Sequence, residues 1–216
     1  MMDAHLHLKW NGQPDKGFVV ALAHGAGAPM DSSFMEMFAL GLFGKGFSVV
    51  RFEFPYMQRR RVDNIRRPPD SLENMQKRWR EVISKLVSMG ISRNRLIIGG
   101  KSMGGRVASM IADSEKILGL VCLGYPFHPP GKPEIKRTEH LELLKAPSLF
   151  VQGTRDTLGS ADDVREYTLS PSICFRWIQD GDHNLKPRKS TNVTHQHALE
   201  EGVNSVADFI YKISKI

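Results

Sequence analysis

The pentapeptide Gly100-Lys101-Ser102-Met103-Gly104 lies between a short apolar segment and a segment with small and apolar residues at helical spacing. Residues 95–99 predict a parallel strand covered on both faces, and residues 103–113 predict a helix. Gly-x-Ser-x-Gly in that setting indicates a sharp strand-to-helix turn that lifts the serine clear of the backbone. Glycines flank the serine because the turn is strained and a Cβ atom at either position would crowd it. The chain is therefore expected to build a parallel sheet with a nucleophilic serine at its edge.

Strand-like and helix-like segments alternate along the rest of the chain. The expected strands are residues 4–10, 17–23, 47–53, 95–99, 117–124, 148–152 and 173–178, and the expected helices are residues 31–44, 71–89, 103–113, 137–145, 160–168 and 190–213. This alternation is typical of an α/β fold with a sheet covered by helices on both faces. Asn11-Gly12 predicts a tight turn that pairs the first two strands antiparallel. We expect about seven strands, six of them parallel, in a single domain over residues 1–216, without a large lid because residues 125–146 are too few to form one.

Composition excludes several classes of protein. A hydrophobic content of 41% and a charged content of 25% over 216 residues indicate a globular chain rather than a disordered or fibrous one. The alternating start lacks the pattern of a secretion signal, and no segment approaches the roughly 18 apolar residues of a membrane span, which predicts a cytoplasmic protein without a membrane partner. Cys122 and Cys174 lie in apolar, strand-like runs and are expected to be small core residues. No metal site and no cofactor are predicted, since neither the cysteines nor the histidine pairs have metal-ligand spacing.

The net charge of +7 is concentrated in one stretch. Residues 51–67 hold six arginines, which are Arg51, Arg59, Arg60, Arg61, Arg66 and Arg67. A solvated loop that favours solubility is the preferred interpretation, and attraction of an anionic substrate is the second. Nucleic acid is the least favoured partner, because the nearby aromatic residues precede the arginines instead of alternating with them.

Three residues that could form a proton relay follow three different strands. Ser102, Asp156 and His183 each come just after the carboxyl end of an expected strand, where the loops of a parallel sheet converge. The order serine, aspartate, histidine is the one expected for this arrangement. A serine hydroxyl needs a base to become a nucleophile, histidine titrates near neutral pH, and a carboxylate would orient the imidazole. Each residue alone also has a structural interpretation, as a helix cap or a loop residue, and the joint placement is what favours the triad.

Other acidic residues compete for the role of the aspartate. Asp180 and Asp182 are too close in sequence to His183 to support it from a neighbouring loop. Glu134 and Glu139, which follow the preceding strand, are weaker alternatives.

A tetrahedral intermediate needs two backbone donors for its oxyanion. The N–H of Met103 at the helix start is expected to be one, and the glycine-rich loop after residues 17–23 is expected to provide the other, from Ala26 or, second, from Gly27. His24 is expected to shape that loop by hydrogen bonding instead of taking part in catalysis. A phosphate-binding loop is not favoured, because no Lys-Ser/Thr follows the glycines.

Five segments together resemble a known family: residues 24–28, 51–56, 100–105, 124–131 and 151–156. The whole chain resembles a small α/β-hydrolase, in the branch that contains dienelactone-hydrolase-like proteins and testis-expressed protein 30. The Gly-Tyr-Pro-Phe-His-Pro-Pro-Gly segment is the more specific pointer to this branch. Dienelactone hydrolases proper have a cysteine nucleophile where this chain has Ser102, so the resemblance does not extend to a dienelactone substrate. It implies an intact serine-hydrolase site in a branch that also includes protein-interaction scaffolds.

The leading hypothesis is a serine hydrolase that cleaves a small-molecule ester or thioester through an acyl-enzyme at Ser102. Tyr56, Met57, Phe127 and Leu158 are expected to line the acyl pocket, because each follows a strand. The alternative is a non-catalytic interaction module that uses the hydrolase fold and binds its partner through residues 59–67. A lyase or haloperoxidase use of the same triad is a third hypothesis, and a homodimer stays open.

Overall fold

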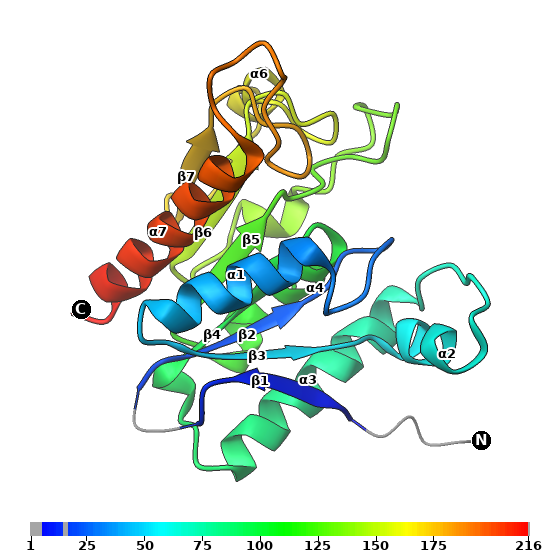
Figure 1. Ribbon diagram of the computed structural model, residues 1–216, viewed down its shortest axis with the longest axis vertical. Helices are drawn as coiled ribbons and strands as arrows, with labels where there is room; N and C mark the ends of the chain where they lie inside the picture. Colours follow the sequence, from blue (N-terminus) through cyan, green and yellow to red (C-terminus); the bar gives the residue numbers. More distant parts are fainter. Residues whose placement is uncertain (1–5, 15–16, 216) are drawn as a thin grey trace.

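The computed structural model describes residues 6–14 and 17–215, and these residues build a seven-stranded mixed sheet (Figure 1). The strands are β1 (Leu8–Asn11), β2 (Val19–Ala23), β3 (Ser48–Phe52), β4 (Leu96–Lys101), β5 (Gly119–Leu123), β6 (Ser148–Gly153) and β7 (Ile173–Ile178). Their order across the sheet is β1-β3-β2-β4-β5-β6-β7. β1 runs antiparallel to β3, and all other neighbouring strands are parallel. The predicted count of seven strands with six parallel is confirmed.

The partner of β1 differs from the prediction. β1 pairs with β3, with Trp10 opposite Val50, and not with β2. Both edges of β2 are already occupied, because Ala21 lies between Val50 of β3 and Ile98 of β4. The turn at Asn11-Gly12 therefore does not form a hairpin between the first two strands, and β1 takes the free edge of β3. Residues 4–5 of the expected first strand lie outside the described part of the chain.

Helices cover both faces of the sheet. They are α1 (Ser33–Gly44), α2 (Pro55–Asp63), α3 (Leu72–Ser88), α4 (Met103–Ser109), α5 (Ala112–Glu115), α6 (Ala161–Arg165) and α7 (His195–Ile213), with 3-10 turns η1 (Arg93–Arg95) and η2 (Glu139–Leu141). α1 and α7 lie side by side on one face, while α3 and α4 lie on the other (Figure 1). The sheet strands β2 to β6 are buried, as expected for a parallel sheet between two helical layers.

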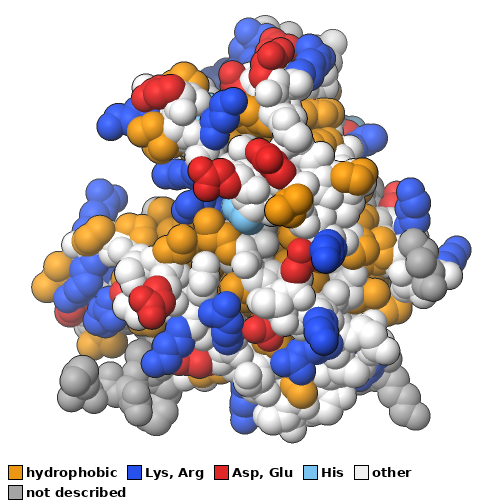
Figure 2. Space-filling model, turned by 180° about the vertical axis from the view of Figure 1, so that it is seen from behind, with side chains coloured by type: hydrophobic (Ala, Val, Ile, Leu, Met, Phe, Trp, Pro, Cys, Tyr) orange, Lys and Arg blue, Asp and Glu red, His pale blue; other side chains and the backbone are white. Residues whose placement is uncertain are grey.

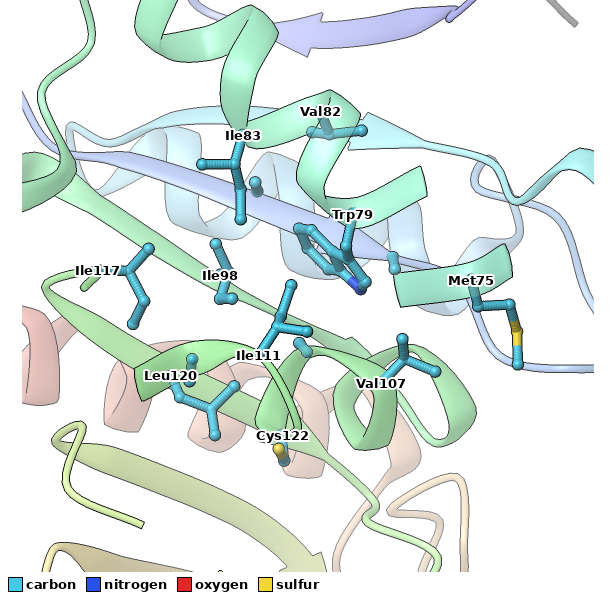
Figure 3. Close-up of a cluster of buried hydrophobic side chains, with 14 of the residues drawn as sticks. Met75, Trp79, Val82, Ile83, Ile98, Val107, Ile111, Ile117, Leu120 and Cys122 are labelled. Atoms are coloured by element: carbon cyan, nitrogen blue, oxygen red, sulfur yellow. The ribbon is translucent and has the colours of Figure 1, made fainter. Parts of the chain in front are cut away.

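The core beneath α3 and α4 is formed by large apolar side chains. Trp79 of α3 is fully buried and packs edge-on against Phe52, with ring centroids 4.6 Å apart. Figure 3 shows Trp79 over Ile98 of β4, with Val107 and Ile111 from the other side of the cluster. Burying one such side chain stabilises the fold by about 1.5–3 kcal/mol. This layer fixes α4, and with it the serine at the start of that helix.

The two cysteines differ from one another. Cys122 is fully buried in the cluster of Figure 3, as predicted, and burial raises the pKa of its thiol. Cys174 is exposed, which corrects its assignment to the core. The reason is that Cys174 lies on β7, the edge strand, where alternate side chains face away from the packed face.

Several expected helices have different bounds. The arginine-rich segment, expected to be a loop, begins with helix α2: Phe54 is extended, Pro55 occupies the first turn and Asn64 ends the helix in a left-handed conformation. The expected helix at residues 137–145 is only the turn η2, and the expected helix at 103–113 is divided into α4 and α5.

The loops that leave the carboxyl ends of the parallel strands gather at one edge of the sheet. α2 projects beside this edge, at the right of Figure 1. Between β5 and β6 the chain contains only η2 and irregular segments, so no large lid covers the edge. Within the described residues, no helix combines the length and the apolar character needed to cross a membrane.

Candidate active site

Ser102 occupies a strained position between β4 and α4. Its backbone has φ 49° and ψ −116°, a region that side chains other than glycine rarely adopt. Such strain costs on the order of 1–3 kcal/mol and persists only where neighbouring contacts enforce it. Here the N–H of Ser102 donates to the carbonyl of Leu123 at 3.0 Å, and its carbonyl accepts from Arg106 at 3.0 Å. The turn is thus held by β5 on one side and by α4 on the other.

The two glycines of the pentapeptide are required by the close approach of β2. A Cβ atom on Gly100, which has φ 152°, would lie 2.1 Å from the carbonyl oxygen of Ala23. A Cβ atom on Gly104 would lie 2.5 Å from the same oxygen. The predicted steric reason for both glycines is confirmed, and the obstructing atom belongs to the neighbouring strand.

A continuous chain of hydrogen bonds joins Ser102, His183 and Asp156. Oγ of Ser102 lies 2.8 Å from Nε2 of His183, and Nδ1 of His183 lies 2.8 Å from Oδ2 of Asp156. Asp156 is fully buried, whereas the side chain of His183 is 24% exposed. Because a carboxylate can only accept, Nδ1 carries the proton and Nε2 is left to accept from the serine hydroxyl. The three residues predicted from strand ends therefore meet at one point.

Asp156 is oriented by Gln152, which the sequence did not single out. Nε2 of Gln152 donates to Oδ2 of Asp156 at 2.9 Å, and the N–H of Leu158 donates to Oδ1 at 2.8 Å. Gln152 is itself fully buried and accepts from the N–H of Tyr125 at 2.7 Å. One feature of the sequence could have indicated this role: Gln152 is an amide at the end of the apolar segment 148–152, and a buried polar side chain needs hydrogen-bond partners.

The loop that carries His183 is stabilised by the two aspartates that precede it. Asp182 accepts from two backbone N–H groups of its own loop. Asp180, which is buried, pairs with Arg155 at 2.8 Å and with Arg188 at 2.6 Å. These carboxylates shape the loop instead of facing the imidazole.

Lys101 connects the serine turn to the histidine loop. Its Nζ donates to the carbonyl oxygen of His183 at 2.5 Å and lies 5.3 Å from the ring centroid of Phe34. Burial lowers the pKa of Lys101 to about 8, because an ammonium loses its hydration there. The sequence pattern identifies this residue only as the second member of the pentapeptide, and nothing in its spacing indicates the contact.

The glycine-rich loop after β2 lies beside the serine. A Cβ atom on Gly25 would be 3.6 Å from Cβ of Ser102. His24 is buried and shapes the loop as expected: Nδ1 donates to the carbonyl of Gly25 at 2.7 Å, and Nε2 accepts from the N–H of Phe54 at 3.1 Å. Burial lowers the pKa of His24, which keeps it neutral for these two roles.

The two backbone donors expected for an oxyanion are both available. Within the described residues, neither the N–H of Met103, at the first position of α4, nor the N–H of Ala26 donates a hydrogen bond. Ala26 is exposed, and its carbonyl accepts from the hydroxyl of Tyr56 at 3.0 Å. The hydrogen bond from Tyr56 thereby holds the glycine-rich loop in place.

The residues expected to line the acyl pocket are mostly inside the core. Tyr56, Met57 and Phe127 are at most 1% exposed, and only Leu158 is partly exposed. Phe127 packs among aromatic rings, with its centroid 4.8 Å from that of Tyr125. These three side chains support the floor of the site and do not form an open wall. A separate hollow of about 420 Å³ is lined by Arg176 and residues of α7, and includes none of the residues expected in the site.

The arginines of residues 59–67 are largely neutralised by carboxylates, which changes the interpretation of this segment as a solvated loop. Arg61 binds Glu53 at 2.7 Å and Asp31 at 2.6 Å, and Arg59 binds Asp70 at 2.5 Å. In Figure 2 the projection that carries α2 lies at the left, where Lys, Arg and hydrophobic side chains gather. Because most of these charges are paired, a high count of arginines does not translate into an equally positive surface.

The comparisons with known proteins agree with this architecture. A family model described as an alpha/beta hydrolase domain matches residues 16–211. Est1E from Butyrivibrio proteoclasticus superposes with a TM-score of 0.71 at 14% identity, covering 98% of this chain and 95% of that one. A monoacylglycerol lipase from Paleococcus ferrophilus gives 0.69 at 17% identity, covering 97% and 99%. XC6422 from Xanthomonas campestris, described as a serine hydrolase without a lid, gives 0.61 at 20% identity, covering 83% and 81%.

Proposed function

Because the chain belongs to the alpha/beta hydrolase domain family, we propose that it is a serine hydrolase whose nucleophile is Ser102. The single observation that carries the proposal is the unbroken hydrogen-bonded series from the Ser102 hydroxyl through His183 to the buried carboxylate of Asp156. The similar structures described as a monoacylglycerol lipase and as a serine hydrolase without a lid support hydrolysis of an acyl compound.

The proposed reaction begins with attack of the Ser102 oxygen on the substrate carbonyl carbon. The hydroxyl proton passes to Nε2 of His183 as the carbon–oxygen bond forms, and Asp156 stabilises the imidazolium. The N–H groups of Met103 and Ala26 donate to the oxyanion. His183 then returns the proton to the departing alcohol or thiol, which leaves an acyl-enzyme. Water, deprotonated by His183, attacks the acyl carbon and releases the acid and the free serine.

An ester or thioester of modest size is the proposed substrate class. The edge carries no large covering segment, which favours access by small molecules. The partly exposed Leu158 and the glycine-rich loop are the surfaces that would face the acyl group. Amides are less favoured, because they need a stronger acid to expel their leaving group.

Labelling with a fluorophosphonate tests the nucleophile directly. The wild-type protein is expected to react with one equivalent of the reagent, and Ser102→Ala is expected not to react. Ser109→Ala is the matched control, since Ser109 also lies 2.8 Å from a histidine nitrogen but is buried. Labelling that survives Ser102→Ala, or that is absent from the wild-type protein, would overturn the proposal.

A further inference from the structure

Two arginines near the proposed nucleophile lie close together without a carboxylate partner. Arg106 lies in α4, and Arg137 lies in the loop between β5 and β6. Neither guanidinium group forms an ion pair or a side-chain hydrogen bond with any residue in the described ranges 6–14 and 17–215. A short series of hydrogen bonds joins the backbones of the two residues. The hydroxyl of Ser109 donates to the carbonyl of Arg106 and lies 2.8 Å from Nε2 of His140, and the hydroxyl of Tyr125 lies 3.5 Å from the same nitrogen and donates to the carbonyl of Arg137. Burial and, second, the charge of Arg106 lower the pKa of Arg137, in agreement with this closeness. The pair is therefore a concentrated and uncompensated positive charge.

Many of the other arginines in the described residues are paired with carboxylates. Arg51 in β3 pairs with Glu36 at 2.8 Å, and Arg188 pairs with Asp180 at 2.6 Å. Nε of Arg106 is buried and has no hydrogen-bond partner among the described residues, and the same is true of Nε of Arg51. The other nitrogens of Arg51 donate to the carbonyl of Met30 and to the side chains of Glu36 and Asn11, whereas those of Arg106 have no such acceptor among the described residues. Burying a donor without an acceptor, beside a second positive charge, is unfavourable. An anion bound between the two guanidinium groups would remove both penalties.

The position of the pair places it within reach of the serine. The N–H of Arg106 donates to the carbonyl of Ser102, so the two residues are one helical turn apart, a rise of about 5–6 Å. The loop at Arg137 is fixed at the same edge of the sheet: its N–H donates to the carbonyl of Phe127 at 2.7 Å, and its carbonyl accepts from the hydroxyl of Tyr125 at 2.9 Å. The face in Figure 2 is hollowed on the side where α2 projects, and Lys and Arg side chains border this hollow.

We propose that Arg106 and Arg137 bind an anionic group of the substrate, a carboxylate or a phosphate, while its ester or thioester carbonyl lies at Ser102. The inference rests on the proposed hydrolase function and specifies its substrate class. Guanidinium groups are suited to this role because they are planar, always charged and able to donate two parallel hydrogen bonds to one oxyanion.

A matched pair of aryl esters tests the specificity. 4-Nitrophenyl hydrogen adipate and 4-nitrophenyl hexanoate have acyl chains of equal length, and differ by a carboxylate in place of a methyl group. Arg106→Gln and Arg137→Gln are each expected to lower kcat/KM for the adipate ester about tenfold, mainly through KM, and to change the hexanoate ester less than about twofold. Arg106→Lys is expected to restore part of the loss. Arg93→Gln, which removes a charge at the opposite end of the sheet, is the control.

Equal losses on both esters, or no loss on the adipate ester, would overturn the inference while leaving the hydrolase function intact. Hydrolysis of neither ester would instead count against the proposed function. In that case calorimetry on Ser102→Ala, with adipate and separately with inorganic phosphate, still decides the inference. Binding of either anion that is weakened at least tenfold by adding Arg106→Gln supports it, and the anion that binds more tightly shows whether the site prefers carboxylate or phosphate. Binding that Arg106→Gln leaves unchanged, or absence of binding of both anions, overturns it.

Discussion

The described part of the chain contains two serine–histidine pairs with the same contact distance. Oγ of Ser102 lies 2.8 Å from Nε2 of His183, and Oγ of Ser109, two turns further along the same region, lies 2.8 Å from Nε2 of His140. Only the first pair has the features of a nucleophile and its base. The second shows that a short serine–histidine contact is not sufficient, and the differences identify what is needed.

The first difference is the direction of the serine proton. The hydroxyl of Ser109 donates to the carbonyl of Arg106 at 2.7 Å, so its oxygen must accept from Nε2–H of His140. The described residues offer the Ser102 hydroxyl no other acceptor than His183. In both pairs a serine Oγ faces a histidine Nε2. In the first pair the serine carries the proton between them, and in the second pair the histidine carries it.

The second difference is the group behind each imidazole. His183 has the carboxylate of Asp156 at 2.8 Å, which fixes its proton on Nδ1 and stabilises its charged form. His140 forms no hydrogen bond or ion pair with a carboxylate among the described residues, and burial together with the charge of Arg106 lowers its pKa to about 4. A base must accept a proton in order to work, and the surroundings of His140 oppose this. A catalytic pair therefore differs from a structural pair in the tautomer of its histidine and in the stabilisation of the imidazolium, and not in the serine–histidine distance.

Asp156→Asn is expected to have the largest effect, because it gives the first pair the proton arrangement of the second. The amide would donate to Nδ1 and place the imidazole proton on Nε2, where it blocks transfer from Ser102. We expect kcat to fall about 10⁴-fold, which is the size of effect that the wrong imidazole tautomer has in a serine-protease triad. The measurement is kcat for 4-nitrophenyl acetate. Asp162→Asn, which changes an exposed carboxylate of α6, is the control. A decrease in kcat of less than tenfold in Asp156→Asn would contradict the assigned role of the carboxylate.

Gln152→Leu is expected to have an intermediate effect. It removes one donor from Asp156 and leaves the N–H of Tyr125 without its acceptor, which should cost about 2–4 kcal/mol in the free energy of unfolding and reduce kcat about 10–100-fold. Chemical denaturation and steady-state kinetics measure the two effects.

Gln152→Glu separates a positioning role from a purely structural one. The glutamate still accepts from Tyr125, but it replaces the donor to Asp156 with a second negative charge. Two carboxylates near His183 would favour the imidazolium, so the acidic limb of the kcat/KM profile should move to higher pH. An unchanged pH profile would mean that Gln152 serves stability alone.

His140→Gln is expected to have the smallest effect, and to affect stability instead of catalysis. Folded protein binds the His140 proton only near pH 4, while the unfolded chain binds it near 6.5. The contribution of His140 is therefore present above pH 6.5 and lost as the pH falls toward 4. Relative to His140→Gln, the wild-type protein should lose about 1–2 kcal/mol over that range, a figure reduced because His140 is partly exposed. Denaturation at pH 7 and pH 4.5 measures it; a difference that does not change with pH would contradict the assignment.

The elements and the site could be predicted from the sequence to different extents. The strand alternation, the serine turn and the order Ser102, Asp156, His183 are local patterns, and the structure places these three residues together. Gln152 and Lys101 could not be predicted, because their partners lie in other segments: Tyr125 for the first and the carbonyl of His183 for the second. A pattern of neighbouring residues does not report such contacts.

The surface charge of residues 51–67 also depends on contacts that the sequence does not show. The sequence showed six arginines in residues 51–67 but not the carboxylates that pair with them, which come from as far as Asp31 and Glu36. Conversely, Arg106 and Arg137 are 31 positions apart, and they come close only because α4 and the loop after β5 are joined by the hydrogen bonds of Ser109, His140 and Tyr125. Charge density along a chain and charge density in space are different quantities.

The sequence alone determined that this protein forms a mostly parallel sheet covered by helices, with a strained serine at the end of β4, because residue periodicity and glycine sterics act over a few neighbouring positions. The tertiary structure decided that β1 pairs with β3, that Tyr56, Met57 and Phe127 are buried, and which arginines have no partner among the described residues. These properties depend on which strand edges are free, on how helices cover the sheet and on which charges meet, and each is a relation between segments far apart in the chain.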